Sequence, residues 1–335
     1  MSEMPPHAEV LSIIISQWTS SAVCALAELG VPDHLESGPR SVEELAEAVG
    51  AQPDLLYRLM RATASVGVLA ETPDGKFEQT PRSEVLRTDA RPTMRYVGKF
   101  NQDEWHIRGW GHLAETVRTG QRPIEAIYGL PAFEYFGKNP DVGANFNQAM
   151  TDLSTVDAPA VAHAYDFRGL GTLTDVGGGH GLLLATVLAY NPDLKGQLFD
   201  LPHVIAGASG GPTEAVKDRV TFSEGDMFES VPAGSDAYMM KYIIHDWPDD
   251  LCIKILRNCR DGVNDGGKLL VIDSVVPTDG TPHVSMISDL EMMLFPSGKE
   301  RTASEFSDLF ADSGWQLKRI LPTSSHVSVI EGVPV

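Results

Sequence analysis

The second half of the chain alternates short apolar runs with segments of helical periodicity. From residue 172 the runs are TLTDV, GQLFD, RVTFSE, AYMMKYII and GKLLVIDSVV, and this spacing is typical of a doubly wound parallel sheet with right-handed crossovers. The last two runs, WQLKRI and HVSVIEG, are joined by only five residues, which is too short for a parallel crossover. We therefore predict an α/β sheet that ends in an antiparallel hairpin.

The first third of the chain predicts a winged helix. An apolar segment without an internal breaker covers residues 8–29, a capping-box pattern opens a second helix at residues 41–44, and a third helix is expected over residues 53–66. Two short strands are expected around the Asp74-Gly75 turn. Such folds often bind DNA, but the net charge is −20 and the third helix carries no basic stripe. We therefore predict a dimerisation module whose apolar first segment is buried against a second copy.

The length and composition of the chain predict its domains and its cellular compartment. With 335 residues, we expect a winged-helix dimerisation domain over residues 1–95, a helical connector over 96–165 that contributes to a substrate pocket, and a catalytic domain over 166–335. The scattered cysteines predict free buried thiols in a reducing compartment; they are Cys24, Cys252 and Cys259. Because no run reaches about 18 apolar residues and the N-terminus lacks a signal-like core, we expect a cytoplasmic protein without a membrane span.

The stretch DVGGGHG follows the first strand of the predicted sheet. In such sheets ligands bind at the carboxyl ends of the strands, and glycines let a ligand approach the backbone. The dinucleotide fingerprint GxGxxG would need its third glycine at Leu182. The spacing here is GxGxG, with Gly177, Gly179 and Gly181. The loop therefore predicts a nucleotide-like ligand but counts against a pyrophosphate cradle.

Acidic residues stand at the ends of the next two strands. Asp200, after the second strand, can accept both hydroxyls of a ribose. Asp226, after the third strand, is followed by Met227 and Phe228, which suit the amino group and the ring face of an adenine. The set predicts an adenosine moiety without phosphate, and S-adenosylmethionine fits it.

A histidine follows the fourth strand, in the segment MKYIIHDWPDD. A phenol has a pKa of about 10, so methyl transfer to its oxygen at neutral pH calls for a base, and His245 stands at the ligand edge of the sheet. Two acids from the same edge are candidates to orient it, Asp273 at the end of the fifth strand and Glu300 in the loop GKERT. Taken singly, a strand-end cap and a surface charge are simpler interpretations of these two acids.

Other charged residues near this histidine have structural interpretations. We expect Asp246 and Asp249 to cap the helix that follows, and Lys241 either to pair with Asp226 or to reach the cofactor. A metal-dependent methyltransferase would use clustered carboxylates, but the run PDD is more typical of a helix start. We therefore predict no metal.

The motifs DVGGGHG, FDLPHVI, GDMF, MKYIIHDWPDD and GKERT together resemble the O-methyltransferase family of the caffeic acid and hydroxyindole type, over residues 10–330. The resemblance implies a Rossmann-like methyltransferase sheet, S-adenosylmethionine as cofactor, and a homodimer whose winged-helix domains exchange contacts. The matching cofactor positions are Gly177, Asp200, Asp226, Met227 and Lys241. The matching histidine base is His245, with partners Asp273 and Glu300. The implied substrate pocket is lined by Met150, Leu290, Glu291 and Met292, to which we add Phe146 from the aromatic connector.

The chain departs from the family pattern at several positions. His180 stands where many members carry Thr or Ser, and Asp273 stands where plant members often have Glu. Glu291 replaces an Asn that bacterial relatives often show, and Phe295-Pro296 replace a polar pair before GKERT. Neither the substrate nor the role of His180 follows from the resemblance.

The sequence thus predicts an O-methyltransferase acting on a phenolic or enolic hydroxyl of a small aromatic metabolite. One alternative is a homologue that binds the same cofactor but catalyses hydroxylation or decarboxylation, and the histidine with two acids counts against it. A second alternative is a winged-helix regulator that senses the cofactor, and the acidic charge counts against it. Neither nucleic acid nor a membrane is expected as a partner.

Overall fold

The computed structural model describes residues 4–208 and 210–335, which form two compact units. The first unit comprises the chain up to Arg108 with Asp141–Leu153, and the second comprises Gly109–Pro140 with Ser154–Val335. Residues 96–165 are thus divided between the two units, and helix α10 (Pro140–Ala164) contributes to both. The three-part division at residues 95 and 165 stays a prediction.

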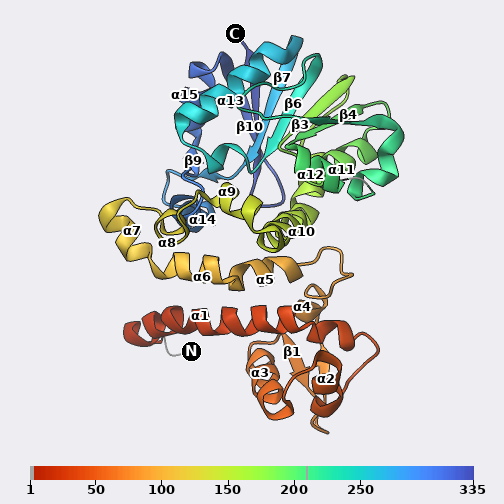
Figure 1. The fold of residues 1–335 in the computed structure, drawn as a ribbon, viewed down its shortest axis with the longest axis vertical. Coiled ribbons are helices and arrows are strands. Elements are labelled where there is room, and N and C mark those ends of the chain that lie inside the picture. The colour runs from red at the N-terminus through yellow and green to blue at the C-terminus, as the bar shows by residue number, and fades with distance from the viewer. Residues whose placement is uncertain (1–3, 209) are drawn as a thin grey trace. The chain divides into compact units, whose positions relative to one another are not determined.

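The first unit has the element order of a winged helix (Figure 1). Its elements are α1 (Pro6–Leu29), η1 (Val31–His34), α2 (Val42–Val49), α3 (Pro53–Ser65), β1 (Leu69–Glu71), β2 (Phe77–Gln79), α4 (Pro81–Glu84), α5 (Arg95–Gln102) and the start of α6 (Glu104–Gly111). The capping box is confirmed, since Ser41 Oγ accepts from the Glu44 amide and Glu44 accepts from the Ser41 amide at 2.8 Å. Gly30 and Gly50 end α1 and α2 with φ of 73° and 69°, a left-handed conformation that glycine adopts freely.

Helix α1 presents exposed apolar side chains from Val10 to Trp18. They are Val10, Leu11, Ile13, Ile14 and Trp18, between 55% and 72% exposed. By length and composition α1 could cross a membrane, and it is the one such helix in the described part of the chain. α1 contains no unbroken apolar run of about 18 residues, and the absence of a membrane span stays a prediction. Length and composition do not distinguish a membrane span from a helix that another protein surface covers.

The second unit is built on a seven-stranded sheet with the order β10-β11-β7-β6-β3-β4-β5. The strands are β3 (Thr172–Val176), β4 (Lys195–Asp200), β5 (Val220–Glu224), β6 (Ser235–Lys241), β7 (Val263–Asp273), β10 (Trp315–Pro322) and β11 (Ser328–Pro334). The five strands β3 to β7 run parallel, whereas β11 pairs antiparallel with both β7 and β10. The predicted parallel sheet with a closing antiparallel hairpin is confirmed. The strand order reverses direction beside β3, which places the glycine loop at the switch point of the sheet.

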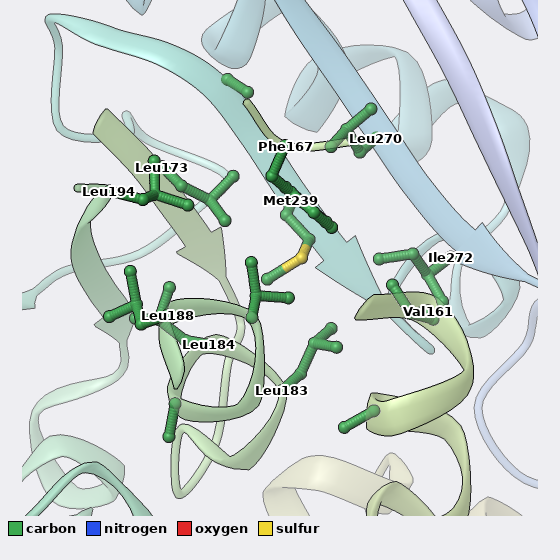
Figure 2. Close-up of a cluster of buried hydrophobic side chains, with 14 of the residues drawn as sticks. Val161, Phe167, Leu173, Leu183, Leu184, Leu188, Leu194, Met239, Leu270 and Ile272 are labelled. Atoms are coloured by element: carbon green, nitrogen blue, oxygen red, sulfur yellow. The ribbon is translucent and has the colours of Figure 1, made fainter. Parts of the chain in front are cut away.

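Helices cover both faces of this sheet, as Figure 1 shows. The helices and turns of the second unit are α7 (Leu113–Thr119), α8 (Pro123–Tyr128), α9 (Ala132–Lys138), α11 (Leu182–Tyr190), α12 (Pro202–Ala208), η2 (Pro212–Arg219), η3 (Ile244–Asp246), α13 (Asp249–Gly262), α14 (Ser285–Leu294) and α15 (Ala303–Asp312). One core packs α11 and the end of α10 on the sheet, with Met239 among leucines of α11 (Figure 2). The other packs α13 and α15 on the opposite face, where Met240 points. Alternate residues of β6 thus serve opposite cores, as a fully buried parallel strand requires.

Helix α13 begins differently from the sequence prediction. Its N-cap is Pro248, and no side chain caps it, so the expectation that Asp246 and Asp249 form the cap is wrong. Asp249 instead lies in the first helical turn and bonds to Arg301, while Asp246 turns toward His245. The three cysteines are confirmed as buried free thiols; two of them, Cys252 and Cys259, lie on the core face of this helix.

A short strand pair joins two regions that are distant in sequence. β8 (Val275–Val276) follows β7 and pairs in parallel with β9 (Arg301–Thr302). Val275 and Arg301 are partners in this ladder, so Asp273 and Glu300 enter the same region of the second unit. The sequence did not predict this pair, because two-residue strands have no period to detect.

Candidate active site

Three glycines of the loop after β3 hold left-handed backbone. Gly177, Gly179 and Gly181 have φ of 67°, 58° and 77°. A Cβ at Gly177 would lie 2.5 Å from Ile243 Cδ1, whereas a Cβ at Gly179 would meet no atom within 4 Å. The GxGxG spacing is therefore required by the backbone, and the loop leaves open space at its middle glycine.

Asp200 fixes this loop from the end of β4. Its carboxylate accepts the Gly179 amide at 2.8 Å and the Leu201 amide at 2.7 Å. Burial raises the pKa of Asp200, and the two amides oppose that shift. Because the Gly179 amide is already bonded to a carboxylate, it is not available to hold a phosphate. His180 lies close enough for the charge of Asp200 to act on it, while burial lowers the pKa of the His180 imidazole.

Asp226 and its neighbours form a turn after β5. Asp226 Oδ1 accepts the Phe228 amide at 2.8 Å, and the Met227 carbonyl accepts Asn258 Nδ2 at 2.8 Å. The Phe228 ring meets Trp247 edge to face, with 4.8 Å between ring centroids. The predicted acid with two apolar neighbours is thus ordered as one turn, and Trp247 extends its apolar surface.

His245 lies in the short turn η3 that follows β6. The imidazole is buried, with Nδ1 3.3 Å from Glu300 Oε1 and Nε2 3.5 Å from Asp246 Oδ1. Asp273 makes no hydrogen bond to this histidine; its Oδ1 accepts the Tyr242 amide at 3.1 Å. Among the described residues, the acid that bonds His245 Nδ1 is therefore Glu300, and Asp273 acts on the histidine through its charge.

Glu300 is itself held by helix α14. Its Oε1 accepts Ser288 Oγ at 2.8 Å, and its backbone amide donates to Asp289 Oδ1 at 2.8 Å. Burial alone would raise the pKa of Glu300, but the hydrogen bond from His245 keeps that pKa below its usual value. An ionised Glu300 beside Nδ1 leaves Nε2 as the imidazole nitrogen that can exchange a proton with a ligand.

The acids around His245 shift its pKa strongly. Burial by itself lowers the pKa of the imidazole, but the charges of Asp273, Asp246 and Glu300 together raise it to about 9. Burial also raises the pKa of Asp273 to about 7 and that of Asp246 to about 6. This environment favours the protonated form of the imidazole.

Arg301 ties the histidine turn to the loop that carries Glu300. Its buried guanidinium donates to the carbonyl of Ile244 at 2.7 Å, to that of Trp247 at 3.0 Å, and to Asp249 Oδ1 at 2.7 Å. These two carbonyls flank His245, so Arg301 fixes the backbone on both sides of the imidazole. The sequence placed Arg301 only as a charged neighbour of Glu300, because nothing in GKERT marks a buried side chain.

Lys241 lies beside a different acid from the predicted Asp226, and its contact with the cofactor stays a prediction. Its ammonium is buried, lies 4.0 Å from Asp157 Oδ2 rather than against Asp226, and sits 3.7 Å from the centroid of the Tyr242 ring. Burial lowers the pKa of Lys241 to about 8, against the charges of Asp157 and two other acids. The one sequence signal for Asp157 was an acid within the apolar run VDAPAVA.

The predicted substrate residues divide between the two units. Glu291, on α14, accepts the indole N–H of Trp110 at 2.8 Å, Met292 beside it is buried, and Leu290 is half-buried. Phe146 and Met150 lie in the first unit, on the part of α10 that belongs there. Their role in a pocket stays a prediction.

Comparison with known proteins decides the family. Residues 110–316 match the family model of the O-methyltransferase domain, and residues 11–89 match that of the O-methyltransferase dimerisation domain. The chain belongs to the O-methyltransferase family.

Named relatives and solved structures agree with this assignment. The enzyme is 38% identical over 333 residues to a phenazine O-methyltransferase from Lysobacter antibioticus, covering 99% of this chain and 97% of the relative. It is 33% identical over 316 residues to an 8-amino-8-demethylriboflavin N,N-dimethyltransferase from Streptomyces davaonensis, covering 92% and 89%. A solved O-methyltransferase from neocarzinostatin biosynthesis, in complex with S-adenosylmethionine and 2-hydroxy-5-methyl naphthoic acid, matches with a TM-score of 0.78 and 33% identity over 95% of this chain and 96% of that chain. The enzyme is an S-adenosylmethionine-dependent methyltransferase of the secondary-metabolite type.

The residues at the strand ends fit this cofactor. The loop is open at Gly179, its amide is bonded to a carboxylate, and Asp200 and Asp226 offer acceptors for hydroxyl and amino groups. Asp175 Oδ2 is buried without a hydrogen-bond partner in the described structure, and burial raises the pKa of this acid to about 7. Such a set of acceptors suits a cationic, phosphate-free adenosyl group.

Proposed function

We propose that the enzyme methylates a phenolic or enolic hydroxyl of a small aromatic metabolite, with His245 as general base. The observation that carries the proposal is the position of His245, at the carboxyl edge of the sheet with Nδ1 bonded to Glu300. That bond directs Nε2 to the acceptor. The pKa of the His245 imidazole, about 9, is close to the pKa of a phenol, about 10, and such a match suits proton transfer.

The chemistry then needs one proton transfer and one displacement. S-Adenosylmethionine supplies a methyl carbon bonded to a positively charged sulfur. His245 Nε2 takes the hydroxyl proton as the acceptor oxygen forms its bond to that carbon, and the carbon–sulfur bond breaks. The products are a methyl ether, S-adenosylhomocysteine and a proton on His245. The charges of Asp273 and Glu300 stabilise the imidazolium that results.

The mass of the product tests the reaction type. We expect a gain of one methyl group when the enzyme and S-adenosylmethionine are incubated with a hydroxyphenazine, after the class in the name of one relative, or with 2-hydroxy-5-methyl naphthoic acid, which is bound in a solved relative. Hydroxylated or decarboxylated products without a methyl gain would support the alternative chemistry instead. Activity that a chelator abolishes would support a metal-dependent mechanism.

N-Methylation is a second candidate, because one relative is an N,N-dimethyltransferase. An amine attacks a methyl group through its neutral lone pair and loses its proton afterwards, so it depends less on a strong base than a phenol does. An aminophenol acceptor separates the two reactions, since fragmentation in the mass spectrometer places the methyl group on oxygen or nitrogen. We expect the methyl group on oxygen.

We further propose that the carboxylate of Asp200 holds the cofactor ribose. Asp200→Asn is expected to weaken S-adenosylhomocysteine binding about tenfold, because hydrogen bonds to a charged acceptor contribute about 1.5–3 kcal/mol and the amide keeps only part of that. Isothermal titration calorimetry measures the change. Asp193→Asn, at an exposed acid before the same strand, is the matched control and should bind normally. Equal affinities of the two variants would refute the assignment.

We also propose that α1 forms a homodimer interface, because it carries exposed apolar side chains and lies, from residue 11 onward, in the region that matches the dimerisation domain. Ile14→Ser should raise the dissociation constant of the dimer about tenfold, equivalent to about 1.4 kcal/mol of lost apolar burial. Light scattering over a dilution series measures it. Phe222→Ser, an exposed aromatic residue on β5, is the control, and an equal shift in both variants would argue against an α1 interface.

A further inference from the structure

Tyr242 has a backbone conformation that bulky residues rarely adopt. It follows Lys241 at the end of β6, and its φ is 58°. Among the described residues other than glycine, Ser297 alone shares this sign of φ. A bulky side chain in the left-handed region raises the energy of the backbone, so its surroundings must hold it there.

Two side chains hold the hydroxyl of Tyr242. Its Oη lies 2.7 Å from Asp157 Oδ2 and 2.8 Å from His326 Nε2. The hydroxyl has one proton, which it donates to the carboxylate, so it accepts from Nε2–H of His326. Burial, together with the charge of Asp157, raises the pKa of Tyr242 well above its ordinary value, so the donor stays protonated.

The ring of Tyr242 contacts His245, and its backbone contacts Asp273. The ring is stacked on the His245 imidazole, with 5.3 Å between centroids and 11° between planes. The backbone amide donates to Asp273 Oδ1 at 3.1 Å. Tyr242 therefore contacts His245, Asp273 and Asp157.

A single hydrogen bond does not fix the plane of an imidazole. The bond that His245 Nδ1 donates to Glu300 sets the direction of one nitrogen, and Asp246 Oδ1 lies 3.5 Å from Nε2, but neither contact is made with a face of the ring. A neighbouring ring that lies parallel to the imidazole restricts its tilt. In the described structure no hydrogen bond joins the Tyr242 hydroxyl to His245, and the two residues meet through nearly parallel, stacked rings.

We propose that Tyr242 is a positioning residue, whose ring fixes the plane of His245 while Asp157 and His326 fix the ring through its hydroxyl. The proposal rests on the proposed role of His245 as base. With the imidazole plane fixed, the lone pair of Nε2 keeps a constant aim at the acceptor hydroxyl. Misalignment of a catalytic group lowers the rate of the chemical step more than it weakens binding.

The test replaces Tyr242 with Phe, which keeps the ring and removes the hydroxyl. The matched control is Tyr238→Phe, since Tyr238 lies on β6, which ends just before Tyr242, is buried, and donates its hydroxyl to the Pro232 carbonyl. Imidazole resonances of ¹⁵N-histidine-labelled enzyme report the ring of His245, which is identified by its absence in His245→Ala. Steady-state kinetics with the best acceptor of the panel above, and S-adenosylhomocysteine binding, are measured on the same variants.

In Y242F we expect kcat to fall about tenfold, with KM for the acceptor and Kd for S-adenosylhomocysteine within about twofold of the wild type. The His245 resonances should broaden or double as the ring gains a second orientation, whereas Y238F should change neither kcat nor these resonances. His326→Ala should lower kcat as well, and combining it with Y242F should lower kcat no further, because both act through one hydroxyl.

Two results would overturn the proposal. One is an unchanged set of His245 resonances in Y242F, and the other is a loss of activity in Y242F that Y238F reproduces. Failure of the base assignment has a separate signature, since His245→Ala would then retain turnover. The resonances of Y242F would in that case still decide whether Tyr242 holds the ring.

Discussion

Replacing His245 with Ala is expected to lower kcat for a phenolic acceptor by roughly 10²–10⁴-fold, the range that a positioned general base contributes. The loss arises because the other side chain that bonds to Glu300 among the described residues is Ser288, whose hydroxyl is not a base at neutral pH. Residual turnover should remain, since holding the donor and acceptor together accelerates transfer without a base. Single-turnover kinetics with a saturating acceptor measure the rate of the methyl-transfer step.

The control for this experiment separates chemistry from folding and binding. S-Adenosylhomocysteine should bind the His245→Ala enzyme with the affinity of the wild type, because the acceptors assigned to the cofactor lie on other strand ends. His163→Ala, at an exposed histidine of α10, should leave kcat unchanged. Near-normal turnover by His245→Ala on a phenol would show that the base is elsewhere.

The second large effect is a dependence of the rate on pH. A base acts only when it is unprotonated, and the surrounding acids raise the pKa of His245 to about 9. At pH 7 about 1% of such an imidazole is neutral, and at pH 9 about half, so kcat/KM should rise about 50-fold between these values. A raised pKa of a base moves activity to higher pH, and activity is lost as the pH falls below about 9.

Variants of the acids decide whether this pH limb belongs to His245. Glu300→Gln and Asp273→Asn each remove a negative charge that raises the pKa of the imidazole, so the limb should move to lower pH in both. Acceptors with different phenolic pKa values provide a control. A pH limb caused by ionisation of the substrate moves with the pKa of the acceptor, whereas a limb caused by His245 stays at the same pH. A rate that is constant from pH 7 to pH 9 would contradict the electrostatics described here.

Much of the fold follows from local patterns. The capping box at Ser41, the hairpin after α15 and the strand ends that carry Asp200 and His245 were all predicted from spacing and periodicity. Each depends on residues close in sequence or on the rule that parallel strands end at one edge. The same patterns failed at α13, because an acid before a helix can turn toward a nearby histidine instead of capping.

The contacts around His245 depend on packing between distant segments. Glu300 and Asp273 were equal candidates to orient His245, and the two-residue pairing of β8 with β9 brings the loop of Glu300 to the imidazole. Arg301 and Tyr242 were not singled out by any motif, although they fix the backbone and the ring of the histidine.

The sequence by itself determined the sheet, the glycine loop and the residue types at each strand end, because backbone conformation and the periodicity of burial depend on residues that are close in sequence. The tertiary structure alone decided which acid bonds His245 and which side chains hold it. His245 and Glu300 are 55 positions apart, and their distance of 3.3 Å is set by how the intervening helices and strands pack. Side-chain contacts at that separation are a property of the packed core, which no local pattern encodes.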